Sequence, residues 1–225
     1  MRTTLVYDLP TRLFHWLFVF FFLSSFVIAK TVDDESILFS YHMISGLLLG
    51  GLIVWRVFWG LIGTRHARWS GFKLNPLELK EYFLGLLSGS KKRWSGHNPA
   101  SSWAAVVMMV LGFALAVSGY LMSIGYKESL EDSHELLANA FIVVAILHVA
   151  GVIFHSLRHQ EALPLSMIDG KKDLFEKNEA IPSTRPGAAF VFIMMLFLST
   201  MYLVSRFDSQ ERTLSLFGQT LELGD

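Results

Sequence analysis

Three histidines lie in one long apolar segment, HELLANAFIVVAILHVAGVIFH, at positions 134, 148 and 155. Ionisable residues inside a bilayer are costly, so such side chains first suggest a function. On a helix that turns 100° per residue, His148 points within about 40° of His134, and His155 about 20° further round. A rise of about 1.5 Å per residue separates His134 from His148 by about 21 Å. The three imidazoles therefore share one face of a helix at different depths.

Two further histidines could pair with them at matching depths. His15 and His42 each lie near the start of an apolar segment. Because consecutive membrane segments run in opposite directions, His42 falls at the depth of His134, and His15 at the depth of His148 or His155. Low-spin haem iron takes two axial nitrogens, which neutral imidazoles supply without added charge. Depth alone thus predicts two bis-histidine b-type haems, with the partner of His15 left open.

Two other kinds of site compete with haem. Zinc sites usually gather three or four ligands in one place, whereas these histidine pairs lie at opposite faces, and Glu135 is the nearest carboxylate along the sequence. Histidines of a proton relay, a histidine-gated transporter or an assembly factor remain an alternative, although such functions do not predict pairs. Haem ligation is the interpretation that explains four histidines matched in depth.

Other residues of the apolar segments and loops have two interpretations each. Arg56 is a basic residue deep in its segment, and it could bind a haem propionate or extend to the inner headgroups. We expect His66, His97 and His159, which fall in inner loops, to be solvated or structural, although His66 could meet a propionate or a quinone headgroup. Several glycines would let a flat ring approach, or let helices pack closely: Gly46, Gly50, Gly51, Gly112, Gly119 and Gly151.

Apolar helices must position these side chains. The chain has 225 residues, of which 52% are hydrophobic, and its mean hydropathy of +0.45 is typical of a membrane protein. A spanning helix needs about 20 apolar residues. Five segments qualify, at about residues 13–29, 37–62, 101–123, 133–157 and 187–204. Residues 75–89, NPLELKEYFLGLLSG, predict a short amphipathic helix on the inner membrane surface.

The distribution of charged residues predicts how the chain is oriented in the membrane, and the composition argues against several kinds of partner and cofactor. Lysine and arginine concentrate in the loops that lie inside if the N-terminus is cytoplasmic, which predicts a periplasmic C-terminus. The outer loops, VDDES and KESLEDSHE, are acidic. The formal net charge of zero gives no support for a nucleic-acid partner. The absence of cysteine excludes disulfides, thiolate-ligated iron–sulfur clusters and covalent c-type haem.

Four stretches of sequence together resemble the bacterial transmembrane cytochrome b family, which includes bacterial cytochrome b561 and the b-type cytochrome subunit of nickel–iron hydrogenases. They are VYDLPTRLFHW, YHMISGLLLGGLIVWRVFWGLIGTRHARWSGF, GHNPASSW and HELLANAFIVVAILHVAGVIFHSLRHQEALPLSMIDGKKD. The likeness covers residues 5 to about 173. It implies a four-helix bundle with two b haems and quinone chemistry near one face. Its ligand pattern matches His15, His42, His134 and His148, which leaves His155 a supporting or structural role.

We therefore predict an all-α integral membrane protein. Residues 1–173 would form a four-helix transmembrane bundle that holds two b haems, and residues 174–225 a linker, a fifth C-terminal transmembrane helix and a periplasmic tail. The predicted function is electron transport across the bacterial inner membrane, within a respiratory chain. Electrons would pass between the quinone pool and a redox partner, either a periplasmic c-type cytochrome or a hydrogenase-like protein. The alternative is a stand-alone quinone oxidoreductase that acts on superoxide or ferric ion.

Overall fold

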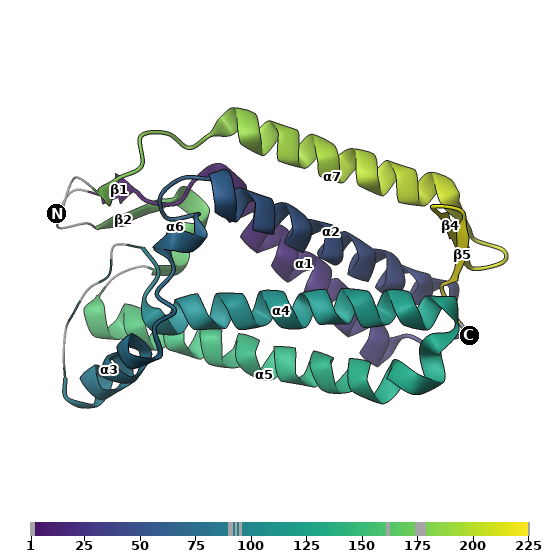
Figure 1. The fold of residues 1–225 in the computed structure, drawn as a ribbon, viewed down its shortest axis with the longest axis horizontal. Helices are drawn as coiled ribbons and strands as arrows, with labels where there is room; N and C mark the ends of the chain where they lie inside the picture. The colour runs from purple at the N-terminus through teal and green to yellow at the C-terminus, as the bar shows by residue number, and fades with distance from the viewer. Residues whose placement is uncertain are drawn as a thin grey trace. The chain divides into compact units, whose positions relative to one another are not determined.

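The computed structural model describes residues 3–89, 92, 94, 96–160, 163–173 and 179–224, and its described part is predominantly helical (Figure 1). The helices are α1 (Leu9–Thr31), α2 (Ser40–Ile62), α3 (Pro76–Leu87), α4 (Pro99–Leu121), α5 (Lys127–His159), α6 (Leu163–Asp169) and α7 (Pro186–Arg206). The strands are β1 (Thr3–Leu5), β2 (Lys171–Asp173), β3 (Phe207–Asp208), β4 (Thr213–Leu216) and β5 (Gln219–Glu222). Short helical turns lie at Ile37–Phe39, Trp69–Gly71 and Met122–Tyr126.

The chain forms two compact units, and the long helices contribute residues to both. Unit 1 consists of Met1–His15, Arg56–Met109 and Ile142–Ala189. Unit 2 consists of Trp16–Trp55, Val110–Phe141 and Phe190–Asp225. Each of the two predicted histidine pairs therefore lies within a single unit. The division predicted between residues 173 and 174 stays a prediction.

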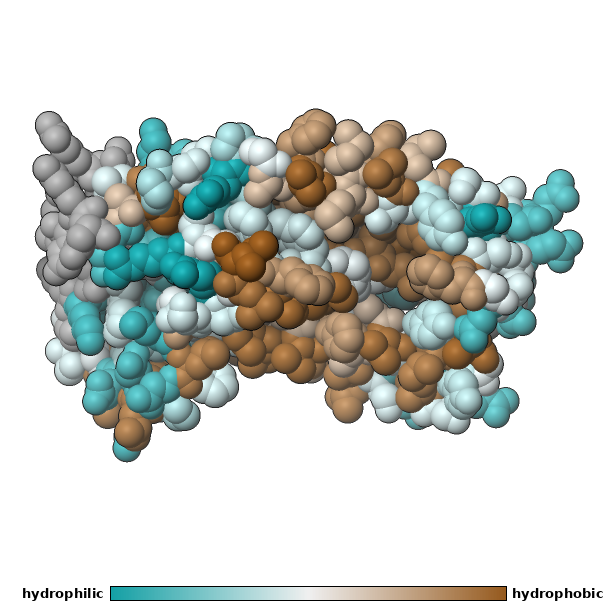
Figure 2. All heavy atoms as spheres, turned by 45° about the horizontal axis from the view of Figure 1, so that its top comes forward, coloured by the Kyte–Doolittle hydropathy of each residue, from teal (hydrophilic) through white to brown (hydrophobic). Residues whose placement is uncertain are grey.

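Among the described residues, four helical stretches are long and apolar enough to cross a membrane, by length and composition: Leu9–Thr31, Ile37–Ile62, Pro99–His159 and Pro186–Arg206. Large hydrophobic side chains remain exposed along them, among them Phe20, Phe58 and Leu136. Figure 2 shows hydrophobic side chains gathered on the visible face. Such exposure is expected of helix faces that contact lipid rather than water.

The third of these stretches is two antiparallel helices. At Ile124 and Gly125 the backbone leaves the helical region, and Gly125 takes a φ of +103°, which glycine tolerates best. Ser118 Oγ lies 2.8 Å from His134 Nδ1, although sixteen residues of straight helix would span about 24 Å. Therefore α4 and α5 run side by side in unit 2, as the segments predicted at 101–123 and 133–157 require. The predicted crossing at 187–204 lies in α7, and its place as a fifth membrane span stays a prediction.

The same capping chemistry begins three helices. In each, a side-chain oxygen accepts a hydrogen bond from a backbone N–H of the first turn, and a proline stands at or near the first helical position. The capping residues are Asp8 for α1, Asn75 for α3 and Asn98 for α4, with N···O distances of 2.8–2.9 Å. The short helix predicted at 75–89 is confirmed as α3, while its position on the membrane surface stays a prediction.

Two small sheets add to the helices that the sequence predicted. In unit 1, β1 pairs antiparallel with β2, from Thr3 opposite Asp173 to Leu5 opposite Lys171. In unit 2, β3, β4 and β5 form an antiparallel sheet. The sequence TLSLFGQTLEL carries a signal for the β4–β5 hairpin, since two alternating runs flank Phe217 and Gly218, which both take positive φ. Hydropathy over long windows does not detect such short strands.

Candidate functional site

His42 of α2 and His134 of α5 face each other in unit 2. Their ring centroids are 6.1 Å apart, and their planes are inclined by 71°. Two metal–imidazole bonds of about 2 Å, with about 1.1 Å from each nitrogen to its ring centre, would separate the centroids by about 6 Å. The spacing of this outer pair thus fits one metal ion held between the two rings.

Hydrogen bonds fix which nitrogen of each ring is protonated. His42 Nδ1 lies 2.8 Å from the carbonyl oxygen of Ser25, and a carbonyl only accepts, so Nδ1 carries the proton. His134 Nδ1 lies 2.8 Å from Ser118 Oγ, which itself donates to the carbonyl of Ala114 and so accepts from the ring. Both rings are then left with an unprotonated Nε2, which is the form that binds a metal. Sequence reasoning missed Ser25 and Ser118.

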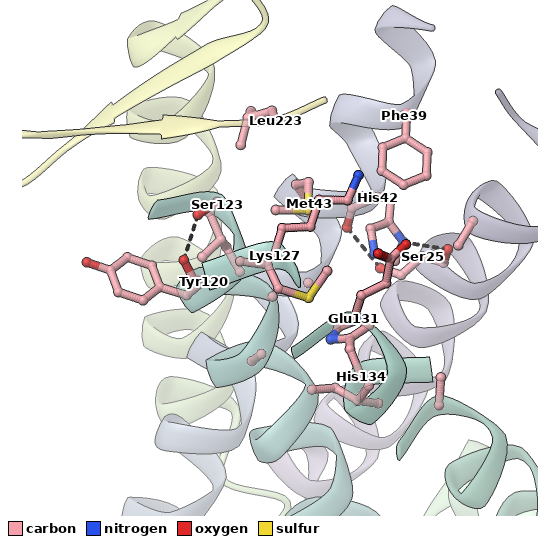
Figure 3. A pocket seen from close by; sticks show the side chains of 18 of the residues that line it. Ser25, Phe39, His42, Met43, Tyr120, Ser123, Lys127, Glu131, His134 and Leu223 are labelled. Atoms are coloured by element: carbon pink, nitrogen blue, oxygen red, sulfur yellow. Dashed lines mark hydrogen bonds between the residues drawn. The ribbon is translucent and has the colours of Figure 1, made fainter. Parts of the chain in front are cut away.

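A cavity of about 540 Å³ adjoins this pair, and both imidazoles line it (Figure 3). That volume lies in the range of cofactor sites. Within the described part of the chain, nothing approaches within 4 Å of a Cβ built on Gly46, whereas one built on Gly119 would meet His134 Cε1 at 3.5 Å. Gly50 and Gly112 differ, because a Cβ there would meet the side chains of neighbouring helices. Gly46 therefore leaves room for a flat group in the cavity. Gly119, which lies beside His134, adds no side chain there.

The inner histidines lie in unit 1. His15 of α1 and His148 of α5 are close enough to interact electrostatically. His155 has other partners: its ring stacks on His159 with centroids 4.1 Å apart, and its Nδ1 lies 3.4 Å from the hydroxyl of Tyr82 in α3. His15 and His148 thus lie in one neighbourhood of unit 1, while the ring and hydrogen-bond contacts of His155 described above are with His159 and Tyr82. Ligation by His15 and His148 stays a prediction.

Arg56 of α2 is buried in unit 1, with 3% of its surface exposed. Its Nη2 donates to the carbonyl of Ala67 at 2.9 Å, and its guanidinium carbon lies 4.7 Å from the ring centroid of Trp69. Among the described residues, Nη1 has no hydrogen-bond partner. A buried and incompletely paired cation is unfavourable. Nη1 of Arg56 could therefore donate to a further buried anion, while the binding of a propionate stays a prediction.

Asp8, which sequence reasoning missed, organises the neighbourhood of Arg56. Its carboxylate is fully buried and interacts electrostatically with Arg56. It accepts hydrogen bonds from Thr64 Oγ1 at 2.6 Å, from Trp59 Nε1 at 3.2 Å and from the backbone N–H of Thr11 at 2.9 Å. The sequence DLP at the start of α1 indicates the cap, but not these contacts with α2 and the turn after it.

Of the three histidines predicted in inner loops, His66 and His97 lie in loops, whereas His159 is the last residue of α5, and all three are structural rather than solvated. His66 and His159 are buried, and His66 Nε2 lies 2.8 Å from the carbonyl oxygen of Glu179. The ring of His97 stacks on Phe72 with centroids 4.8 Å apart and meets the ring of Tyr7 edge-on. Burial, assisted by nearby positive groups, lowers the pKa of His97 to about 3. The neutral ring is therefore the form that the fold accommodates.

The low pKa of His97 predicts acid sensitivity. Between its ordinary pKa of about 6.5 and about 3, the unfolded chain binds a proton that the folded chain does not. Stability should fall as the pH is lowered through this range, by up to about 1.4 kcal/mol per pH unit. The groups that interact electrostatically with His97 are Arg56, Lys172, His66 and His148.

The variant His97→Phe keeps an aromatic ring against Phe72 and removes the imidazole that would bind a proton at low pH. We expect its melting temperature in detergent to depend less steeply on pH between 7 and 4 than that of the parent chain. Equal slopes for the two proteins would show that His97 does not cause the acid sensitivity.

Apolar helices that bring imidazoles together are typical of one class of protein, the membrane b-type cytochromes. A family model described as prokaryotic cytochrome b561 matches residues 6–170, and the chain belongs to this family. A relative from Rhizobium leguminosarum bv. viciae is named "Probable Ni/Fe-hydrogenase B-type cytochrome subunit". It is 23% identical over an alignment of 220 residues, and the match covers 79% of this chain and 92% of the relative. No solved structure matches the chain. The protein is a multi-pass bacterial membrane cytochrome of electron transfer, and its family implies b-type haem.

If His134 holds a haem, its hydrogen bond to Ser118 should contribute to haem retention. Partners that orient a metal-ligating histidine typically contribute 10–100-fold to metal affinity. We therefore expect Ser118→Ala to weaken haem binding at the outer site by about tenfold, measured by titration of haem-depleted protein. A matched control is Ser205→Ala on α7, where the hydroxyl donates to a backbone carbonyl at 2.8 Å. An equal loss in both variants would contradict the orienting role.

Proposed function

We propose that the chain is a di-haem cytochrome b that carries electrons across the bacterial inner membrane between the quinone pool and a redox partner protein. His42 and His134 would ligate the periplasmic haem, and His15 and His148 the cytoplasmic one. Each haem iron supplies a one-electron redox centre. The observation that carries the proposal is the outer pair, with rings 6.1 Å apart and both Nδ1 atoms held by hydrogen-bond partners.

Three roles of the chain follow from this assignment. The histidines hold the iron through neutral nitrogens, so ligation adds no charge to the apolar interior. Ser25 and Ser118 fix the ring orientations. Arg56 would bind a propionate of the inner haem through Nη1, the atom that lacks a partner among the described residues.

Pairing of β1 with β2 supports the proposed topology. Both strands belong to unit 1 and are hydrogen-bonded to each other, so they lie on the same side of the membrane. The chain between residue 5 and residue 171 must therefore cross the membrane an even number of times. Four crossings by α1, α2, α4 and α5 satisfy this condition. The distribution of lysine and arginine then favours a cytoplasmic N-terminus. With α7 as a fifth crossing, the C-terminal sheet would lie at the periplasmic face.

Two observations suggest a redox partner: the name of the Rhizobium relative and the acidic residues near the outer cavity. The relative is named as a subunit of a nickel–iron hydrogenase, so a hydrogenase-like protein is one candidate. Acidic residues near the outer cavity, including Glu128, Glu131 and Glu222, would suit the basic face of a periplasmic c-type cytochrome instead. Co-purification of the membrane protein with each candidate from detergent extracts would separate these two partners.

A pyridine haemochrome assay on the purified full chain tests the proposal directly. We expect about two b haems per chain, since two histidine pairs are present. One haem per chain would show that one of the assigned pairs is wrong. A chain that holds no haem, after expression with ample haem, would contradict the proposed function and favour a transporter or an assembly factor.

A further inference from the structure

The C-terminal sheet of unit 2 lies beside the cavity of the outer histidines. It follows α7 and is beyond the family match, which ends at residue 170. Residues 221–224 nonetheless line the same cavity as His42 and His134. In Figure 3, Leu223 lies at the edge of this cavity, on the side of the C-terminal strands. The sheet therefore contributes a wall to a site whose other walls come from the family's own helices.

Three hydrogen bonds attach the sheet to both sides of the cavity. Ser40 Oγ, at the start of α2, donates to the carbonyl of Leu223 at 3.2 Å. The hydroxyl of Tyr120, near the end of α4, donates to Gln219 Oε1 at 2.7 Å. Arg212 donates to the carbonyl of Glu35 in the loop before α2. The sheet is thus held from the side of His42 and from the helical hairpin that carries His134.

An apolar core makes this attachment rigid. Leu214 and Leu221 of the sheet and Leu223, which follows β5 directly, have no exposed surface. They pack in one cluster with Ile44 and Leu48 of α2 and with Leu203 of α7. Ile44 lies half a turn beyond His42, so the same part of α2 carries the ligand and supports the sheet. Leu221 and Leu223 reach the cavity, whereas Leu214 is not among its lining residues.

We propose that the C-terminal sheet is a built part of the outer haem site, in which Leu221 and Leu223 cover one side of the cavity and limit the access of water to the cofactor from that side. This inference rests on the proposed function for the identity of the cofactor, but the covered side itself is a property of the chain. Ferric haem carries one more positive charge than ferrous haem, and surroundings of low polarity disfavour charge. An apolar wall on this side would therefore hold the outer haem at a higher reduction potential than a side open to water would.

Two buried leucines give a matched pair for the test. Leu223→Ala opens the wall, while Leu52→Ala removes the same atoms from α2 at a position, 2% exposed, that is neither among the lining residues of the cavity nor in the cluster that supports the sheet. Because the chain has no cysteine, Ser123→Cys introduces a single thiol at a buried position of the cavity wall, where 5% of the residue is exposed. Its reaction with a water-soluble maleimide reports water access, with or without haem.

We expect Leu223→Ala to raise the labelling rate about tenfold, as for a local opening, and to shift the outer haem to a more negative potential without moving the inner one. Leu52→Ala should leave both quantities close to the parent values. Equal effects of the two variants, or no effect of either, would overturn the proposal. If Leu223→Ala does not fold, Ser40→Ala removes one attachment and should give the same pattern more weakly. A haem-free parent chain would contradict the proposed function alone, since labelling still tests closure.

Discussion

Replacement of His148 by alanine should remove the inner haem and leave the outer one. Alanine cannot ligate iron, and His15 would keep one axial bond where the site requires two. His42 and His134 belong to the other unit and hold their own hydrogen bonds. The haemochrome assay should therefore fall from two haems per chain to one. Redox titration of the variant should show a single potential, which matches the outer haem of the parent protein.

His155→Ala is the matched control for this loss. His155 lies seven residues along the same helix, and its ring contacts His159 and Tyr82. We expect both haems to remain in this variant, with a modest decrease in melting temperature because the stacked ring is lost. Loss of the inner haem in His155→Ala, with retention in His148→Ala, would reverse the assignment of the inner ligand.

Removal of the Asp8 carboxylate should destabilise the folded chain by about 3 kcal/mol or more. Asp8→Ala leaves the hydroxyl of Thr64, the indole N–H of Trp59 and the first turn of α1 without their acceptor. Each buried donor left unsatisfied costs about 1–3 kcal/mol, and the buried charge of Arg56 loses its nearby counter-charge. Thermal unfolding in detergent, followed by circular dichroism, measures the effect.

An exposed aspartate provides the comparison. Asp33 also accepts a hydrogen bond from a backbone N–H, that of Glu35 at 2.9 Å, but it lies in an exposed loop. Asp33→Ala should change the stability by less than about 1 kcal/mol. Asp8→Asn, which keeps one acceptor oxygen, should fall between the two alanine variants. Similar losses for Asp8→Ala and Asp33→Ala would contradict the role of Asp8 as a buried centre of the fold.

The long helices were predictable because a bilayer imposes one simple rule on sequence. About 20 apolar residues are needed to cross it, and the helical elements of the structure contain each of the five segments so identified. The approach of His42 to His134 was also predictable, since a fixed rise per residue on antiparallel helices places the two at the same level without any tertiary information. The structure brings these two rings together.

Rotation about the helix axes was harder to predict than depth. The carbonyl of Ser25 and the hydroxyl of Ser118 reach the Nδ1 atoms only in one rotational setting of α1 and α4, and apolar composition on all sides leaves this setting undetermined. Asp8 was missed for a related reason, since its partners Trp59 and Thr64 are about 50 residues away in sequence. Short-range patterns identify a cap, but they do not show that it is buried under another helix.

The pairing of β1 with β2 constrains how the protein is made. Thr4 and Lys172 lie opposite each other in this ladder, 168 residues apart in the chain. At about 5–20 residues per second, translation takes roughly 10–30 s to reach the second strand. During that time β1 has no partner strand, while the intervening helices are inserted into the membrane. The unit that contains His15 and His148 is therefore completed late in synthesis, and a cofactor that requires the finished unit must bind after most of the chain has left the ribosome.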